Sequence, residues 1–388
     1  MSHKIITQYD SFPFELPLIL DGATGTNLIK AGMPSGVCPE TWILENPETL
    51  VSLHRAYEAA GSDAVYAPTF GGNAITLASH KVTADKAEII NGALASMARS
   101  ATRCLIGGDV SPTGRMMYPL GDMTFEIASD IYAQQAKSMS KSCDFFVTET
   151  NISLAEARAA VYGIRSVSDK PVFATISVSE NGRTLCGDTP LASLISLAHA
   201  GVSAFGLNCS CGPESMIGLL SGLVPFSMAL GVPLIAKPNA GKPHDVNGQT
   251  VFDMGADEFA SHIADAVGSG IMIVGGCCGT SPEYISAIKE KLNTVKVMPS
   301  AAQPDVSRLA ATNSAVCEIT ADAEIMSVGD FIDGDESAVV NLKSRADADE
   351  LIENMYMLPA PFAVCGDCNA IDIISRKYCG YAPILQRI

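Results

Sequence analysis

Three cysteines carry the strongest chemical signal in this sequence. Cys209 ends an apolar run, while Cys277 and Cys278 stand side by side between glycines. Three thiolates gathered around zinc leave its fourth position open, which marks a catalytic rather than a structural site. We therefore predict that Cys209, Cys277 and Cys278 bind zinc and form the catalytic centre, against the alternative that they are plain buried thiols.

A zinc ion on three thiolates favours the activation of a substrate thiol. A free thiol has a pKa of about 8.5 and is mostly protonated at neutral pH, whereas zinc holds a bound thiol as its thiolate. A methylated sulfur is neutral and a poor zinc ligand, so methylation promotes its release. Adjacent cysteines cannot both face one metal from a regular strand. We expect Gly275, Gly276 and Gly279 to supply the unusual backbone angles that turn both sulfurs inward.

A second group of residues suits an amino-acid ligand. The small-residue loop after Asp21 has N–H groups that can bind a carboxylate. The carboxylates of Asp21 and Glu149 suit an ammonium group, with helix capping or loop hydrogen bonding as the alternative for each. Asn208 lies near the end of an apolar run and Asn239 follows one, and we place both beside the substrate. The loop consists of Gly22, Ala23, Thr24 and Gly25.

Eight short apolar runs place these residues at equivalent positions, because each candidate lies at the end of a run or just after it. The runs are largely apolar rather than alternating, as expected of parallel strands that are covered on both faces. They are Pro17–Asp21, Asp63–Ala67, Cys104–Val110, Asp144–Glu149, Pro171–Ser177, Ser203–Cys209, Pro233–Lys237 and Gly270–Gly275.

Helical patterns separate the apolar runs. One apolar stripe with three- and four-residue spacing runs from Phe125 to Met139, and we expect further helices over 84–101, 153–167, 190–200 and 256–268. Eight strand-then-helix units predict a closed (β/α)8 barrel of the TIM type, with an open doubly wound sheet as the competing fold. In such a barrel the active site lies where the strands end. Proline followed by an acid marks three more helix starts, at Pro47, Pro213 and Pro282.

The chain extends beyond the predicted barrel. We assign residues 1–298 to the barrel with its zinc site, 299–314 to a linker and 315–388 to a small α/β appendage. Cys365 and Cys368, which are separated by two residues, are expected to be thiols that only contribute to packing. Within the appendage we predict strands at Ala323–Val328, Ala338–Leu342 and Phe362–Cys365, and helices at Ala346–Met357 and Asn369–Tyr378.

Composition narrows the classes of partner. The 388 residues carry a formal net charge of −17, and no Lys/Arg cluster offers the basic surface that nucleic acid requires. No signal peptide or membrane-spanning stretch is evident, so we expect a cytoplasmic protein without a membrane partner. The 12 cysteines are then thiols or metal ligands rather than disulfides.

Seven segments, in order along the chain, resemble the homocysteine S-methyltransferase domain family over roughly residues 15–295. The resemblance implies a (β/α)8 barrel with zinc on Cys209, Cys277 and Cys278. It also implies homocysteine contacts at Asp21, the glycine-rich loop and Glu149, and methionine as the product. The segments are Asp21–Thr26, Pro68–Phe70, Ser111–Gly114, Glu149-Thr150, Gly206–Cys209, Pro238–Gly241 and Gly275–Thr280.

Within that family, Pro119–Asp122 is most similar to the N-terminal module of cobalamin-dependent methionine synthase. About 90 residues follow the barrel here, too few for corrinoid modules, so we expect any corrinoid to act in trans, on a separate protein. Two other interpretations stay open. One is a barrel enzyme that binds phosphate in the loop after the eighth strand, and the other is a non-catalytic partner subunit of a corrinoid protein.

Overall fold

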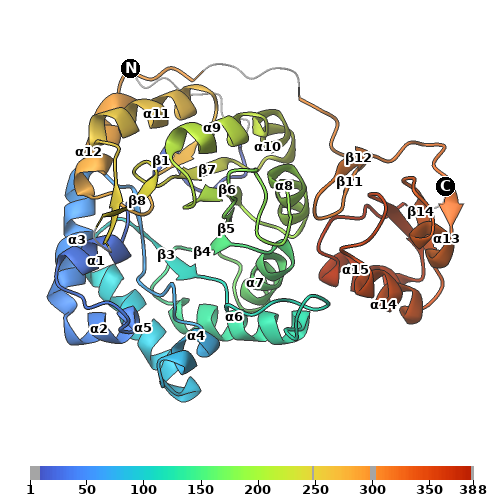
Figure 1. Cartoon of the computed structure of the whole chain (residues 1–388), viewed down its shortest axis with the longest axis horizontal. Helices are drawn as coiled ribbons and strands as arrows, with labels where there is room; N and C mark the ends of the chain where they lie inside the picture. Colours follow the sequence, from blue (N-terminus) through green and yellow to red (C-terminus); the bar gives the residue numbers. More distant parts are fainter. Residues whose placement is uncertain (1–8, 247–248, 298–302, 386–388) are drawn as a thin grey trace.

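The computed structural model describes residues 9–246, 249–297 and 303–385. It consists of a large barrel and a smaller α/β unit formed by the C-terminal part of the chain (Figure 1). The smaller unit lies beside the barrel helices α7 (Leu154–Val167) and α8 (Pro190–His199). This arrangement agrees with the predicted barrel and appendage, while the exact domain limits stay predictions.

Eight parallel strands form the barrel sheet, in the order β1-β10-β7-β6-β5-β4-β3-β2. The end strands approach each other, because Asp63 N–H donates to the Ile19 carbonyl over 2.7 Å and Ile19 N–H donates to the Asp63 carboxylate over 2.9 Å. Each strand lies within one predicted apolar run, apart from a two-residue extension of β4. The strands are β1 (Leu18–Ile19), β2 (Ala64–Tyr66), β3 (Leu105–Val110), β4 (Phe145–Asn151), β5 (Val172–Ile176), β6 (Ala204–Asn208), β7 (Leu234–Lys237) and β10 (Ile273–Val274).

The sheet separates two hydrophobic cores. The interior core contains Phe145, Val147 and Phe173, and the outer core lies between the sheet and the helices. Phe12 and Phe14, before β1, close the interior core by stacking or edge contacts with Phe173 and Phe145, each at a centroid distance of 5.7 Å. The strands are therefore buried on both faces, which explains why their sequences are apolar throughout.

Helices alternate with the strands, and the predicted helices are present as α5, α6, α7, α8 and α11. The helix starts predicted at proline residues are also confirmed. Helices α3, α9 and α12 begin at Pro47, Pro213 and Pro282. The barrel helices not yet given are α1 (Gly25–Lys30), α2 (Pro39–Glu45), α3 (Pro47–Ala60), α4 (Ala74–Ser79), α5 (Ala84–Ala101), α6 (Phe125–Met139), α9 (Pro213–Ser221), α10 (Val224–Leu230), α11 (Ala256–Gly268) and α12 (Pro282–Leu292).

Several elements of the barrel were not predicted, among them the short helices α2, α4 and α10. An antiparallel hairpin, β8 (Pro243–Val246) with β9 (Gln249–Phe252), follows β7. Helix α1 begins at Gly25, so the small-residue loop after Asp21 runs directly into a helix. None of these elements is long enough to show a clear hydrophobic period in the sequence.

The smaller unit has a three-stranded parallel sheet in the order β13-β14-β15. Its strands and two longer helices fall where the sequence predicted them. The predicted linker also contains β11 (Leu309–Ala311), which pairs with β12 (Val316–Glu318). The remaining elements are β13 (Ile325–Met326), α13 (Val328–Ile332), β14 (Val339–Leu342), α14 (Arg345–Glu353), β15 (Ala363–Gly366) and α15 (Cys368–Lys377).

Side chains of the barrel hold the smaller unit in place. The Arg158 guanidinium and the Tyr162 hydroxyl, both on α7, donate to the Ser375 carbonyl on α15 over 2.6 and 2.9 Å. The rings of His199 and Tyr381 stack with centroids 3.5 Å apart. The unit is thus fixed to the outer helices of the barrel.

The lengths and apolar content of the described helices bear on whether they could cross a membrane. None of them alone is long and apolar enough to cross a bilayer, and only the bent pair of α9 and α10 passes that comparison together, by length and composition.

Candidate active site

A cavity of about 400 Å³ opens at the C-terminal ends of the barrel strands. The small-residue loop lines one side, and Glu149 and Lys237 line another. Cys209, Cys277 and Cys278 also face this space. This is the position at which a (β/α)8 barrel carries its active site.

The three predicted cysteines come together. Their sulfur atoms all lie within 4.8 Å of one another, and Cys209 Sγ is 3.9 Å from Cys278 Sγ. Cys209 follows β6 with a φ of 60°, and Ser210 follows with a φ of 62°. Such left-handed backbone costs a non-glycine residue about 1–2 kcal/mol. Strain of this kind is found where the surrounding structure fixes a functional side chain.

The cysteine pair lies in a turn after β10. Gly279 has a φ of 86°, as predicted for a residue that redirects the chain. Gly275 and Gly276 are different, because neither has a positive φ, and the expectation of unusual backbone angles at these two positions was wrong. Their role is close packing: a Cβ on Gly275 would lie 2.8 Å from the Asp21 carbonyl oxygen, and one on Gly276 would lie 2.4 Å from Thr280 Oγ1.

The cysteine cluster has suitable geometry and chemistry for zinc. Tetrahedral zinc with Zn–S bonds of about 2.3 Å separates its sulfur ligands by about 3.8 Å, close to the 3.9 Å between Cys209 and Cys278. Hydrogen bonds from the Cys277 and Cys278 thiols lower the pKa of Cys209 to about 3. The Asn239 side chain also lowers it, and the same contacts with Cys209 raise the pKa of Cys278 to about 12. A metal cation would take the place of the protons that the three sulfurs share.

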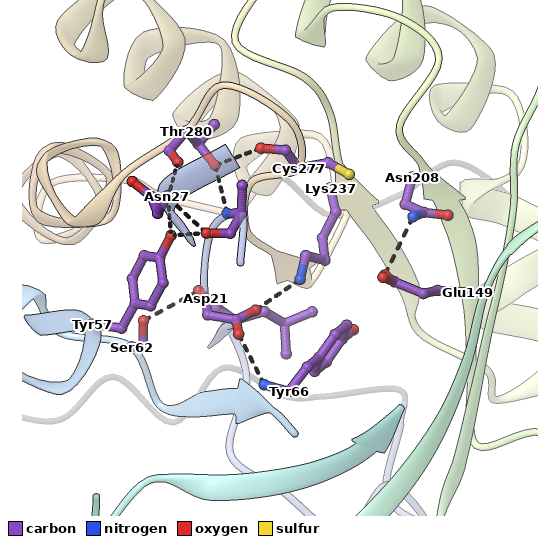
Figure 2. A network of polar contacts seen from close by, with 12 residues as sticks. Asp21, Asn27, Tyr57, Ser62, Tyr66, Glu149, Asn208, Lys237, Cys277 and Thr280 are labelled. Atoms are coloured by element: carbon purple, nitrogen blue, oxygen red, sulfur yellow. Dashed lines mark hydrogen bonds and ion pairs between the residues drawn. The ribbon is translucent and has the colours of Figure 1, made fainter. Parts of the chain in front are cut away.

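A buried ion pair that the sequence did not predict lies beside the cluster. Lys237 Nζ is 2.8 Å from Asp21 Oδ1, and the Tyr66 N–H donates to Asp21 Oδ2 over 2.8 Å. The lysine amine also lies 3.8 Å from the centre of the Tyr66 ring. Burial alone would lower the pKa of Lys237, but the charges of Asp21 and Glu149 outweigh burial and raise it. Figure 2 shows this amine between the Asp21 carboxylate and the Tyr66 ring.

Glu149 lies on the other side of the cavity. The Asn208 side-chain amide donates to Glu149 Oε2 over 3.3 Å (Figure 2). Asn208 Oδ1 in turn accepts hydrogen bonds from Thr150 N–H and Thr175 Oγ1, both over 2.8 Å. Burial, together with the nearby charges of Asp21 and Cys209, raises the pKa of Glu149 to about 7 against the opposing effect of Lys237. Asn208 therefore positions the Glu149 carboxyl.

The small-residue loop is tied to the cysteine turn through Thr280. Thr280 Oγ1 accepts from Ala23 N–H over 3.1 Å and donates to the Cys277 carbonyl over 2.7 Å. Tyr57 Oη donates to the Ala23 carbonyl over 2.8 Å, and the Asn27 amide donates to the Thr280 carbonyl over 2.9 Å. These contacts, drawn in Figure 2, join the small-residue loop and the cysteine turn into one unit.

Most predicted site residues line the cavity. Asp21, the loop from Gly22 through Ala23 and Thr24 to Gly25, Glu149 and the three cysteines are all among its walls. Asn208 and Asn239 do not line the cavity themselves. Asn208 contacts Glu149 and Asn239 contacts Cys209, and both of these partners line it. The sequence analysis missed Lys237 and Asp109, although each is a charged residue near the end of an apolar run.

Three backbone N–H groups in the turn after β10 are not free to form the alternative phosphate cradle. Such a cradle needs free backbone N–H groups. Here Gly275 N–H donates to the Ala236 carbonyl, Gly276 N–H to Asp21 and Cys277 N–H to Pro238, over 2.8–3.0 Å. These donors are already used within the protein.

Comparisons with known proteins agree on the barrel. Residues 18–292 match the family described as homocysteine S-methyltransferase. The methionine synthase of Mycobacterium tuberculosis is 30% identical over 300 residues, covering 72% of this chain and 25% of that protein. The methionine synthase of Mycobacterium leprae is 30% identical over 292 residues, covering 70% and 24%. The chain thus spans about a quarter of the length of these relatives.

A solved structure shares the fold. The metallated form of the Escherichia coli homocysteine methyltransferase MmuM matches with a TM-score of 0.58 and 21% sequence identity, covering 71% of this chain and 96% of that one. At this identity the likeness concerns the fold, which is the predicted (β/α)8 barrel.

Proposed function

The chain belongs to the homocysteine S-methyltransferase family, a family of methyltransferases, and on that premise we propose that it methylates homocysteine to methionine with zinc bound by Cys209, Cys277 and Cys278. The observation that carries this proposal is the cluster of three sulfurs within 4.8 Å of one another in a cavity lined by carboxylates. When bound, zinc would hold the substrate sulfur as a thiolate at neutral pH.

We propose that the rest of the cavity recognises the amino-acid end of homocysteine. The small-residue loop from Gly22 to Gly25 offers backbone N–H groups to the carboxylate, and Glu149 offers an acceptor to the ammonium group. Asn208 keeps the Glu149 carboxyl in place through its 3.3 Å hydrogen bond. The Asn239 amide supports the thiolate of Cys209.

The methyl donor is proposed to be a methyl-corrinoid carried by a separate protein. Support comes from the resemblance of Pro119–Asp122 to the corrinoid-linked branch and from the 30% identity to methionine synthases. In the transfer, the sulfur lone pair forms the new S–CH3 bond while the bond from the methyl carbon to the donor breaks. The donor leaves with that electron pair, and the sulfur becomes a neutral thioether.

One assay tests the proposed function. Purified protein is analysed for zinc and then incubated with homocysteine and, separately, with methylcobalamin, S-methylmethionine, S-adenosylmethionine, betaine or methyltetrahydrofolate. Methionine formation that depends on zinc is the expected result. If no donor yields methionine from zinc-loaded protein, the proposed activity is wrong. If S-methylmethionine or S-adenosylmethionine is superior by orders of magnitude, the corrinoid donor is wrong while the activity stands.

A further inference from the structure

A short hairpin of the C-terminal unit packs against the barrel. It consists of β11 and β12, which pair in antiparallel fashion, and its turn covers residues 312–315. The hairpin lies against α8 (Figure 1), where Leu309 and Ala311 pack on Ala192 and Ile195. The family match ends at residue 292, so this hairpin lies outside the domain that the family shares.

The turn of this hairpin is hydrogen-bonded to the loop that precedes α8. Thr189 N–H, immediately before α8, donates to the Asn313 carbonyl over 3.0 Å. The Asn313 side-chain amide donates to Asp188 Oδ1 over 3.2 Å, and both residues are buried. Because the loop from β5 to α8 follows the end of a barrel strand, the turn contacts the barrel on the face that carries the cavity.

Asp188 is a buried carboxylate that links this loop to the neighbouring one. Its Oδ2 accepts from the N–H of Leu154, the first residue of α7, and from Thr184 Oγ1, both over 2.7 Å. Burial raises the pKa of Asp188, while the hydrogen bonds from Thr184, Leu154 and Asn313 oppose that rise. The buried carboxylate therefore depends on its three donors, one of which comes from the hairpin.

The segment that Asp188 fixes leads directly back to Glu149. Only two residues separate β4, which carries Glu149, from α7. The Cys186 N–H donates to the Ile152 carbonyl over 3.2 Å, so the loop from β5 to α8 holds this turn at a second point. Thr150, next to Glu149, has a φ of 60°, which a β-branched residue adopts where the surrounding contacts enforce it. The position of Glu149 thus depends on the contacts that hold this turn.

We propose that Asn313 of the hairpin is a positioning residue for Glu149, acting through Asp188 and the first turn of α7. The inference rests on the proposed function, because it concerns the carboxyl that is proposed there to accept the ammonium group. Apolar packing on α8 would suffice to attach the C-terminal unit, since a buried hydrogen bond adds little net stability. The contact between Asn313 and Asp188 gives the unit a task in the active site as well.

An exchange of the two partners tests this inference. Asn313→Asp places a second carboxylate beside Asp188 in a buried site, where like charges repel. In the double variant with Asp188→Asn, the new amide donates to the new carboxylate, and its oxygen still accepts from Leu154. In titration calorimetry of zinc-loaded protein, homocysteine should bind about threefold to tenfold more weakly to the single variant, the effect of one lost hydrogen bond. The double variant should recover most of this loss.

A second ligand separates positioning from a general loss of structure. 4-Mercaptobutanoate has the carbon chain, thiol and carboxylate of homocysteine but no ammonium group, so its binding to Asn313→Asp should change by less than about twofold. Tyr162→Phe is the matched control, because it removes another hydrogen bond between the barrel and the C-terminal unit, to the Ser375 carbonyl. Tyr162 lies about 12 Å further along α7 than Leu154, so this variant should bind both ligands as the unchanged protein does.

The two ligands and the control give distinct outcomes. Weaker binding of homocysteine alone, with recovery in the double variant and unchanged zinc content, supports the role of Asn313. Equal weakening of both ligands, the same weakening in Tyr162→Phe, no recovery or no weakening would overturn it, while the proposed function stands. If Asn313→Asp does not fold, Asn313→Ser removes the amide without adding charge, and the same difference between the ligands is expected. Failure of the unchanged, zinc-loaded protein to bind homocysteine would overturn both.

Discussion

The amine of Lys237 lies 2.8 Å from Oδ1 of Asp21, and the two side chains are only 4% and 1% exposed. They come from distant parts of the chain and meet at the wall of the cavity, because β1 and β7 are both neighbours of β10. A buried charge without its partner is costly, since few water molecules can solvate it.

Lys237→Met should therefore destabilise the protein by about 3–5 kcal/mol, because it leaves the Asp21 carboxylate buried and unpaired. Urea unfolding of the single variant measures this loss, and the double variant with Asp21→Asn should recover part of it. Lys289→Met is the matched control, because Lys289 pairs with Asp63 at a partly exposed site, where ion pairs contribute about 0–1 kcal/mol. A loss no greater than that of the control contradicts this account of the pair.

Cys277→Ala and Cys278→Ala should each remove most of the bound zinc, because each variant takes one sulfur from the cluster. Elemental analysis of the purified proteins gives the zinc content per chain. Cys211→Ala is the control: Cys211 lies two residues after Cys209 but outside the cluster, so its zinc content should be unchanged. Full zinc in both cluster variants would show that the metal lies elsewhere.

Glu149 should make stability depend on pH. The unfolded carboxyl ionises near 4.5, whereas burial raises its pKa in the folded protein to about 7. Between these values unfolding releases a proton, so the free energy of unfolding should fall as pH rises from 4.5 through about 7. The contribution is the difference between the metal-free protein and its Glu149→Gln variant in urea unfolding from pH 5 to pH 8. A difference that does not vary with pH would mean that Glu149 is ionised throughout.

Gly276→Ala should disturb the cysteine turn, because the added Cβ would lie 2.4 Å from Thr280 Oγ1. We expect a loss of about 1–3 kcal/mol in stability, as for other overpacked sites, together with weaker zinc binding. Gly218→Ala in α9 is the control, since an added Cβ meets nothing within 4 Å there and alanine favours a helix. If both variants behave alike in thermal unfolding and zinc titration, close packing at Gly276 is unimportant.

The barrel fold and the candidate metal ligands could both be predicted from the sequence. Continuous apolar runs are the consequence of strands buried on both faces, so the eight strands could be read directly. The cysteines were conspicuous because Cys277 and Cys278 are adjacent and flanked by glycine. The match to the homocysteine S-methyltransferase family confirms the resemblance predicted from these segments.

The contacts around the cavity could not be read in the same way. The pairing of Lys237 with Asp21 spans 216 residues, and nothing local in the sequence indicates which charge will meet which. The left-handed backbone at Cys209 is equally hidden, because cysteine has no preference for that conformation. Such features depend on how the closed sheet aligns its strand ends.

Thr280 bridges Ala23 N–H and the Cys277 carbonyl through a single hydroxyl. In the proposed function, the turn that carries the metal ligands and the loop that binds the amino-acid end of the substrate are therefore joined by one side chain, so the fold fixes the distance between them. The cavity would then select ligands by the length of the carbon chain between the thiol and the amino-acid end. We expect a thiol amino acid that is one methylene shorter than homocysteine to lose contacts at one end of the cavity.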